Sequence, residues 1–262
     1  MGIDLQKASI GKRIIAFIFD FICVITIAVG LMIPFSAAVG YDDYSEKSET
    51  ITEKYLTESL VKHNISQLSS DEISKLTKEE KDAYANSYKT AIKDADEALN
   101  KDKESRYILD MTLHLFLLTA IIPLLISFLL YEFALPLFLK NGQTLGKKIF
   151  GIALMHKEGI RVKNIQLFIR ALFGKYVIET MLVLFVIVYF GSSTVIGLIF
   201  LLIYAVAQII CMVSSHSNSP IHDLMAGTVA VDMASQRIFE TYDQLIEHNK
   251  KIAAERAKRQ TY

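Results

Sequence analysis

Four long apolar runs alternate with polar segments along the chain, and each run approaches the length of a membrane-spanning helix. A helix needs about 20 consecutive apolar residues to cross the hydrocarbon core of a bilayer. The runs cover residues 14–39, 108–139, 176–190 and 194–213. The third is short, but an amphipathic segment at 167–175 extends it, and the polar break Gly191-Ser192-Ser193 joins it to the fourth as a helical hairpin. This pattern predicts an all-α, polytopic membrane protein with four transmembrane helices.

Charges between the runs predict how the chain lies in the membrane. Residues 140–175 carry eight lysines and arginines against one acidic residue, Glu158, and short basic loops stay on the cytoplasmic side. With four spans, both termini are then cytoplasmic. We expect a multi-pass protein of the cell membrane, of a bacterial plasma membrane. The predicted segments are the N-terminus with the first span (1–40), an extracytoplasmic helical insert (41–107), the second span (108–139), a cytoplasmic basic loop with an amphipathic helix (140–175), the hairpin of the third and fourth spans (176–213), and a cytoplasmic tail with an amphipathic helix (214–262).

The first run has a second interpretation as a cleaved secretory signal. Lys12 and Arg13 would form its basic start, and the small residues at 35–40 its cleavage site. An aspartate at position 20, a proline at position 34 and the length of the run are untypical of a signal. We therefore expect an uncleaved first helix.

The polar segments carry local signals of their own. SSDE at 69–72 and TKEE at 77–80 fit the capping box that begins helices, and no proline or glycine stands between residues 77 and 122. The second of these helices is thus expected to run unbroken into the second span, with a disordered tether as the alternative for the insert. Residues 149–162 resemble a hairpin of two short strands, and residues 236–259 an amphipathic helix.

Composition narrows the class of protein further. Apolar residues make up 52% of the 262, the mean hydropathy is +0.34 and the formal net charge is zero, which together are unlike an average soluble domain. No basic patch with interleaved aromatic residues suggests nucleic-acid binding. Both cysteines, Cys23 and Cys211, lie in apolar runs, so we expect no metal site, and no sequence motif indicates a cofactor.

An acidic residue inside the first apolar run is the main lead to function. Asp20 lies seven residues after Arg13, roughly 10 Å along a helix from the membrane surface. An ionised carboxylate at that depth costs on the order of several kcal/mol in free energy unless it is paired, protonated or hydrated. Asp20 therefore needs a partner from elsewhere in the chain.

Other ionisable residues are expected at a similar depth on the cytoplasmic side. Asp223 and His222 follow the fourth run, and Arg170 lies in the amphipathic segment. We expect an inward-facing polar pocket in which Arg13 or Arg170 bridges Asp20 and Asp223. A buried ionic contact that only fixes helix packing is the alternative. Glu132 and Glu179 are secondary candidates, since either side chain has the length to reach the membrane surface.

The loop that follows the second span adds two more secondary candidates, Gln143 and Lys147. Gly142 and Gly146 allow turn conformations, and Lys147 with Lys148 would lie beside exposed backbone amides. Such a loop suits an anion or a lipid headgroup, although a basic topology loop with a turn explains it equally well.

Three blocks of sequence resemble a known family. RIIAFIFD at 13–20, GQTLGKKIFGI at 142–152 and PIHDLMAGTVAV at 220–231 are similar, in this order, to the signature blocks of the RDD family of membrane proteins, named for one arginine and two aspartates. The resemblance carries over to Arg13, Asp20 and Asp223, and it leaves the insert and the tail helix outside. It implies a transporter, with exchange of sodium or lithium against protons as the activity described for some members.

Two functions remain open from the sequence. In an exchanger, Asp20 and Asp223 bind a cation or a proton while Arg13 or Arg170 competes for them, and four spans would require a homo-oligomer. In a non-transporting membrane module, the charged cluster is structural, and the insert or tail recruits a partner or senses lipid. An enzyme is not expected, because His222 and Asp223 face apart on a helix and no activated nucleophile is recognisable. Whether the charged residues line a wet cavity or are mutually satisfied distinguishes the first two.

Overall fold

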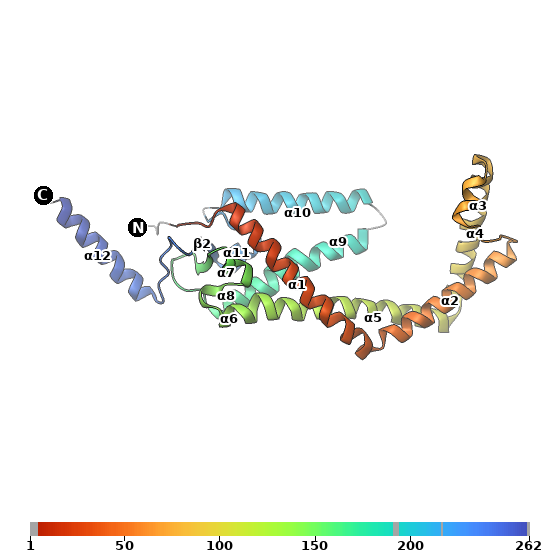
Figure 1. Ribbon diagram of the computed structural model, residues 1–262, viewed down its shortest axis with the longest axis horizontal. Coiled ribbons are helices and arrows are strands. Elements are labelled where there is room, and N and C mark those ends of the chain that lie inside the picture. Colours follow the sequence, from red (N-terminus) through yellow and green to blue (C-terminus); the bar gives the residue numbers. More distant parts are fainter. Residues whose placement is uncertain (1–4, 191–193, 216, 261–262) are drawn as a thin grey trace. The chain divides into compact units, whose positions relative to one another are not determined.

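The computed structural model describes residues 5–190, 194–215 and 217–260, and it is mostly helical (Figure 1). The chain divides into two compact units, each treated by itself below. One comprises Met1–Val29 with Leu124–Tyr262, and the other Gly30–Pro123.

Among the described residues, three helices are long and apolar enough to cross a membrane. They are α1 (Ile10–Val39), the helix of Lys103–Phe138 and α10 (Thr194–Ser214), which match the first, second and fourth predicted runs. The third run divides between a π-helical segment, η3 (Arg170–Met181), and α9 (Leu182–Phe190). Gly191-Ser192-Ser193, the predicted connection, lies outside the described residues. Four spans and their orientation therefore remain predictions.

The second long helix changes its winding near its end. It consists of α5 (Lys103–Phe128), a π-helical turn η1 (Leu129–Ala134) and α6 (Leu135–Phe138). Pro136 has no N–H to bond the carbonyl of residue 132, which favours a wider turn here. Tyr131 and Glu132 are adjacent in sequence, and both are buried within this turn.

A two-stranded sheet closes one end of the larger unit. Strand β1 (Ile152–His156) pairs antiparallel with β2 (Thr228–Asp232), with Leu154 opposite Ala230. The predicted hairpin within 149–162 is therefore wrong, because the main partner of β1 is β2. A single bridge does join Met155 to Arg161. The chain turns into α8 soon after this bridge, whereas the alternating TVAVD sequence of β2 supplies a full apolar strand that buries β1.

Short helices connect the sheet to the long ones. They are η2 (Lys140–Gly142), α7 (Leu145–Ile149), α8 (Asn164–Ile169) and α11 (Ile221–Ala226). Ile152 and Leu154 of β1 pack with Ala16 of α1 and Leu167 of α8 in one buried cluster. This packing fixes the loop after the second long helix against the beginning of the first.

The smaller unit contains the predicted insert, which is helical. Helix α2 (Tyr41–Lys62) packs on α4 (Lys78–Lys101), with the Ser59 hydroxyl donating to the Ala91 carbonyl at 2.7 Å. Both predicted capping boxes are present, at the starts of α3 (Ser70–Lys75) and α4. These helices contradict the disordered-tether alternative.

Two predicted helix boundaries are wrong. Helix α4 ends at Lys101, because Asp102 is extended and its carboxylate accepts from the backbone N–H of Ser105, in the first turn of α5. The tail helix α12 (Tyr242–Gln260) begins later than residue 236. The preceding segment instead pairs with the loop, where the Arg161 N–H donates to the Phe239 carbonyl at 2.8 Å.

Candidate functional site

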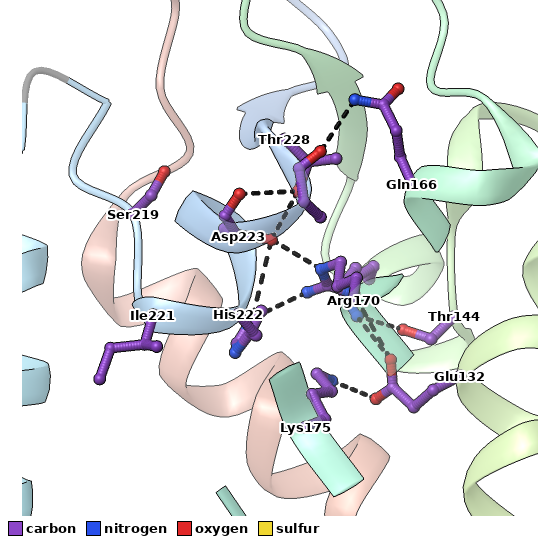
Figure 2. Close-up of polar contacts among 12 residues, drawn as sticks. Glu132, Thr144, Gln166, Arg170, Lys175, Ser219, Ile221, His222, Asp223 and Thr228 are labelled. Atoms are coloured by element: carbon purple, nitrogen blue, oxygen red, sulfur yellow. Dashed lines mark hydrogen bonds and ion pairs between the residues drawn. The ribbon is translucent and has the colours of Figure 1, made fainter. Parts of the chain in front are cut away.

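Eight charged side chains, one of them linked through His222, form a connected network inside the larger unit. Figure 2 shows the part of it around Arg170. The four acids are Asp20, Glu132, Glu179 and Asp223, and the four bases are Arg13, Lys147, Arg170 and Lys175. They come from α1, η1, α7, η3 and α11, so the network joins the long helices to the short helices α7 and α11. Equal numbers of the two charges make the network neutral as a whole.

Asp20 is almost fully buried, at 1% exposure, and four donors surround its carboxylate. It accepts from the Tyr131 hydroxyl at 2.8 Å, the Thr144 hydroxyl at 2.5 Å, the Gly146 N–H at 2.8 Å and Lys147 Nζ at 3.1 Å. The expected bridge by Arg13 or Arg170 is therefore wrong, since among the described residues the ion pair of Asp20 is with Lys147. The loop places Lys147 inward, where its charge offsets that of Asp20.

Gly146 allows the loop to approach this carboxylate. A Cβ atom at this position would lie 2.6 Å from the Ala16 carbonyl oxygen and 2.7 Å from Asp20 Oδ1, closer than atoms pack. Only glycine fits between the loop and α1 without displacing the Asp20 hydrogen bonds.

Substituting this glycine tests the approach. We expect Gly146→Ala to reduce the apparent free energy of unfolding by about 1–3 kcal/mol through overpacking. Thermal unfolding in detergent would measure the loss. Gly11→Ala is the matched control on α1, because its Cβ would meet no atom within 4 Å. Equal stability of the two variants would contradict the close approach.

Glu132 connects three of the bases. Its carboxylate contacts Lys175, Arg170 NH1 at 3.5 Å and Lys147 Nζ at 3.9 Å. The side chain is 2% exposed, so the expectation that it reaches the membrane surface is wrong. The wider π turn at η1 directs it inward beside Tyr131.

Arg170 lies at the centre of the second half of the network, as Figure 2 shows. Its Nε donates to Asp223 Oδ1 at 2.6 Å, and its NH2 group lies 3.0 Å from His222 Nε2. Thr228 donates a further hydrogen bond to Asp223 at 3.0 Å. Close contact of η3 with α11 depends on Gly174, where a Cβ would lie 2.5 Å from the Cβ of His222.

The contacts of His222 define its protonation state. An arginine nitrogen only donates, so Nε2 of His222 must accept from Arg170 and the ring is neutral, with its proton on Nδ1. That proton is donated to Glu179 Oε1 at 2.6 Å. Burial lowers the pKa of His222 below its ordinary value, in agreement with the neutral ring.

Glu179 differs from the other three carboxylates. Its side chain is 14% exposed, against 2% for each of the others, so it is partly buried rather than extended to the membrane surface as expected. Its neighbours are His222 and the Gln208 amide, which donates at 2.9 Å. Among the described residues, no lysine or arginine nitrogen lies within ion-pair distance of it.

Arg13 lies at the edge of the network. Its NH1 group donates to the Asn218 carbonyl at 2.6 Å, and its NH2 group lies 3.7 Å from Asp223 Oδ2. Gln143, another predicted site residue, lies elsewhere and donates to the Ile152 carbonyl at 2.8 Å. Its contact holds the loop against β1.

A cavity of about 360 Å³ adjoins the network between α1, η3, α10 and α11. Arg13, Lys147, Arg170, Lys175, Glu179, Tyr204, Gln208, His222 and Asp223 line it together with apolar side chains. Asp20 and Glu132 do not belong to this lining. The network thus has a buried, satisfied end at Asp20 and a cavity-facing end at Glu179.

Sequence reasoning missed several members of the site. Tyr131 and Thr144 bind Asp20, and Lys175 binds Glu132. Gln208 was detectable as an amide inside the fourth apolar run. In the part of the chain that the structure describes, no group of three or more histidine, cysteine, aspartate and glutamate side chains is arranged to hold a metal ion.

Comparison with known proteins identifies the family. The sequence model of the RDD family matches residues 7–227, which includes every charged residue of the network. No curated protein and no solved structure matches the chain.

Proposed function

We propose that this chain, which belongs to the RDD family of membrane proteins, is a transporter that exchanges a monovalent cation such as Na⁺ or Li⁺ for protons. The observation that carries the proposal is the position of Glu179. It is the one carboxylate of the network, among the described residues, that faces the cavity without a lysine or arginine in ion-pair contact.

The charge balance supports a role for Glu179 in coupling. Asp20, Glu132 and Asp223 are matched to four bases, which leaves that part of the network with one positive charge in excess. The ionised Glu179 carboxylate balances it. Either a proton or a monovalent cation on Glu179 adds the same single charge, so the two can replace one another with the total charge of the network unchanged.

His222 offers a way to transmit the exchange. Its neutral ring donates to Glu179 and accepts from Arg170, so it is sensitive to the charge on both sides. When a proton neutralises Glu179, the hydrogen bond from His222 weakens, because a neutral carboxyl is a poorer acceptor than a carboxylate. The cation loses its counter-charge at the same moment and is released into the cavity.

Asp20, Asp223, Arg13 and Arg170 then act mainly as the frame of the site. Asp20 has its full set of donors, and Asp223 is held by Arg170 and Thr228. A frame of matched charges keeps the cavity walls fixed while Glu179 changes its ligand. The coupling carboxylate proposed here is thus Glu179, in place of Asp20 and Asp223, which were expected from the sequence.

Four spans with cytoplasmic termini in a bacterial plasma membrane would suit this activity. Alternating access requires two bodies that move against one another, and four spans are few for both. We therefore propose a homo-oligomer, at least a dimer. Cross-linking in native membranes would test its size.

Proton flux in proteoliposomes tests the proposal. We expect Na⁺ or Li⁺ gradients to drive proton flux with the wild type, and Glu179→Gln to reduce it to the level of empty liposomes. The amide still accepts from His222, so the expected loss of stability is within about 1 kcal/mol. Glu158→Gln, which neutralises an exposed loop carboxylate, is the control and should retain flux.

A second function is favoured by the other end of the network. Because Asp20 is buried and fully satisfied, the charged cluster also suits a non-transporting membrane module whose ion pairs only hold the helices together. This alternative predicts no flux from the wild type under sodium, lithium or potassium gradients. Such a result, with correctly folded protein, would reject the exchanger.

A further inference from the structure

We infer that the cavity beside Arg13 binds an anionic phospholipid, with its phosphate at the guanidinium of Arg13 and one acyl chain along the apolar wall between α1 and α10. This site is independent of the exchange proposed at Glu179. It concerns a different ligand and a different side of the cavity, since Asp223 and His222 stand between Arg13 and Glu179 in the chain of contacts.

Charge in the cavity lining favours an anion. Four bases line the cavity, against the two carboxylates of Glu179 and Asp223. Three of the four bases are paired at short distance: Lys147 and Lys175 with Asp20 and Glu132, which lie outside the lining, and Arg170 with Asp223. Arg13 is then the lining base that, among the described residues, has no carboxylate closer than 3.7 Å, and an anionic group in the cavity would meet its charge.

Arg13 has hydrogen-bonding capacity to spare. A guanidinium has five N–H donors, and among the described residues the contacts of Arg13 are NH1 with the Asn218 carbonyl and a long 3.7 Å approach of NH2 to Asp223. Its side chain is 8% exposed and lines the cavity. A phosphate there would accept two hydrogen bonds from the planar guanidinium.

The rest of the lining favours a ligand with an apolar part. Ile14 and Phe17 of α1 and Met212 of α10 line the same cavity. Ile14 and Phe17 are about half exposed, at 49% and 50%, on a helix long enough to span the membrane. The apolar wall therefore continues onto a surface that lipid chains would cover. A free phosphate would leave this wall without a partner, whereas a phospholipid covers both parts.

Lipid titration of the purified, delipidated protein in a neutral detergent tests the site. The probes are phosphatidylglycerol, phosphatidylcholine with the same acyl chains, and glycerol phosphate, which has the head without the chains. Phosphatidylglycerol is expected to raise the melting temperature in a saturable manner, because a ligand of the folded state stabilises it. Phosphatidylcholine should do so weakly, and glycerol phosphate should have no effect.

Three variants locate the binding. Arg13→Gln is expected to weaken the apparent affinity for phosphatidylglycerol about tenfold, through the lost charge-assisted pair. Met212→Trp fills the apolar part of the cavity without changing charge and should weaken the affinity for phosphatidylglycerol to a similar extent. It tests the site independently if Arg13→Gln does not fold. Lys12→Gln removes a neighbouring exposed charge that pairs with Asp232 outside the cavity, and should bind as the wild type does.

Three results would overturn the inference. One is an equal rise of the melting temperature with phosphatidylglycerol and phosphatidylcholine, which would mean that the headgroup charge does not affect binding. Another is the full response with glycerol phosphate, which would make the ligand a soluble anion. The third is undiminished phosphatidylglycerol binding by both Arg13→Gln and Met212→Trp.

Discussion

Asp20→Asn is expected to destabilise the protein by about 3–5 kcal/mol, the range for removing one partner of a buried ion pair. The change keeps the shape of the side chain, but Asp20 accepts from four donors and asparagine has a single acceptor oxygen. Its NH2 group would face other donors. Lys147 would also lose its close counter-charge and keep only Glu132, at 3.9 Å.

Thermal and denaturant unfolding in detergent would measure this loss. Asp232→Asn is the control, because Asp232 pairs with Lys12 at the surface and its removal should cost far less than Asp20→Asn. Combining Asp20→Asn with Lys147→Met removes both charges, so the double variant should be more stable than Asp20→Asn alone. A wild-type melting curve for Asp20→Asn would show that the carboxylate is not a packing element.

Local patterns were sufficient to predict most of the helices. Apolar runs gave the three long helices, and the capping boxes at Ser69 and Thr77 gave the starts of α3 and α4. Both signals act within a few residues of the chain. The boundary at Asp102 was missed because an aspartate can cap a helix without any proline or glycine to mark the break.

Long-range pairing could not be predicted in the same way. Strand β2 lies far from β1 in sequence. A turn at 157–159 made the segment that follows it a nearer partner for β1. Lys147 is 127 residues from Asp20, and as one of eight basic residues in its loop it carried no sign of being buried. Burial of a charge depends on the three-dimensional packing around it, which periodicity does not contain.

The sequence predicted which residues belong to the candidate site better than it predicted which of them form ion pairs. Arg13, Asp20, Arg170 and Asp223 do belong to one network, and Glu132, Glu179, His222 and Lys147 belong to it as well. What separates Glu179 from the other acids is the absence of a lysine or arginine partner among the described residues, together with its place on the cavity wall. Both are properties of the folded chain alone.

Arg170→Gln is expected to cost about 3–5 kcal/mol as well, because it leaves two buried carboxylates without their shared cation. Asp223 would lose its bond at 2.6 Å, and Glu132 would keep only lysine partners. His222 would lose the donor at Nε2 that fixes its neutral tautomer. Unfolding in detergent measures the effect, with Arg161→Gln as the control for an exposed arginine that pairs with Glu240.

Arg170→Lys separates charge from geometry at this position. Lysine keeps the positive charge, but one ammonium group cannot reach Asp223, Glu132 and His222 as the planar guanidinium does. The lysine variant should therefore recover less than half of the stability lost in Arg170→Gln. Full recovery would mean that charge alone is required, and the three-way contact of Arg170 would then have no part in holding η3 against α11.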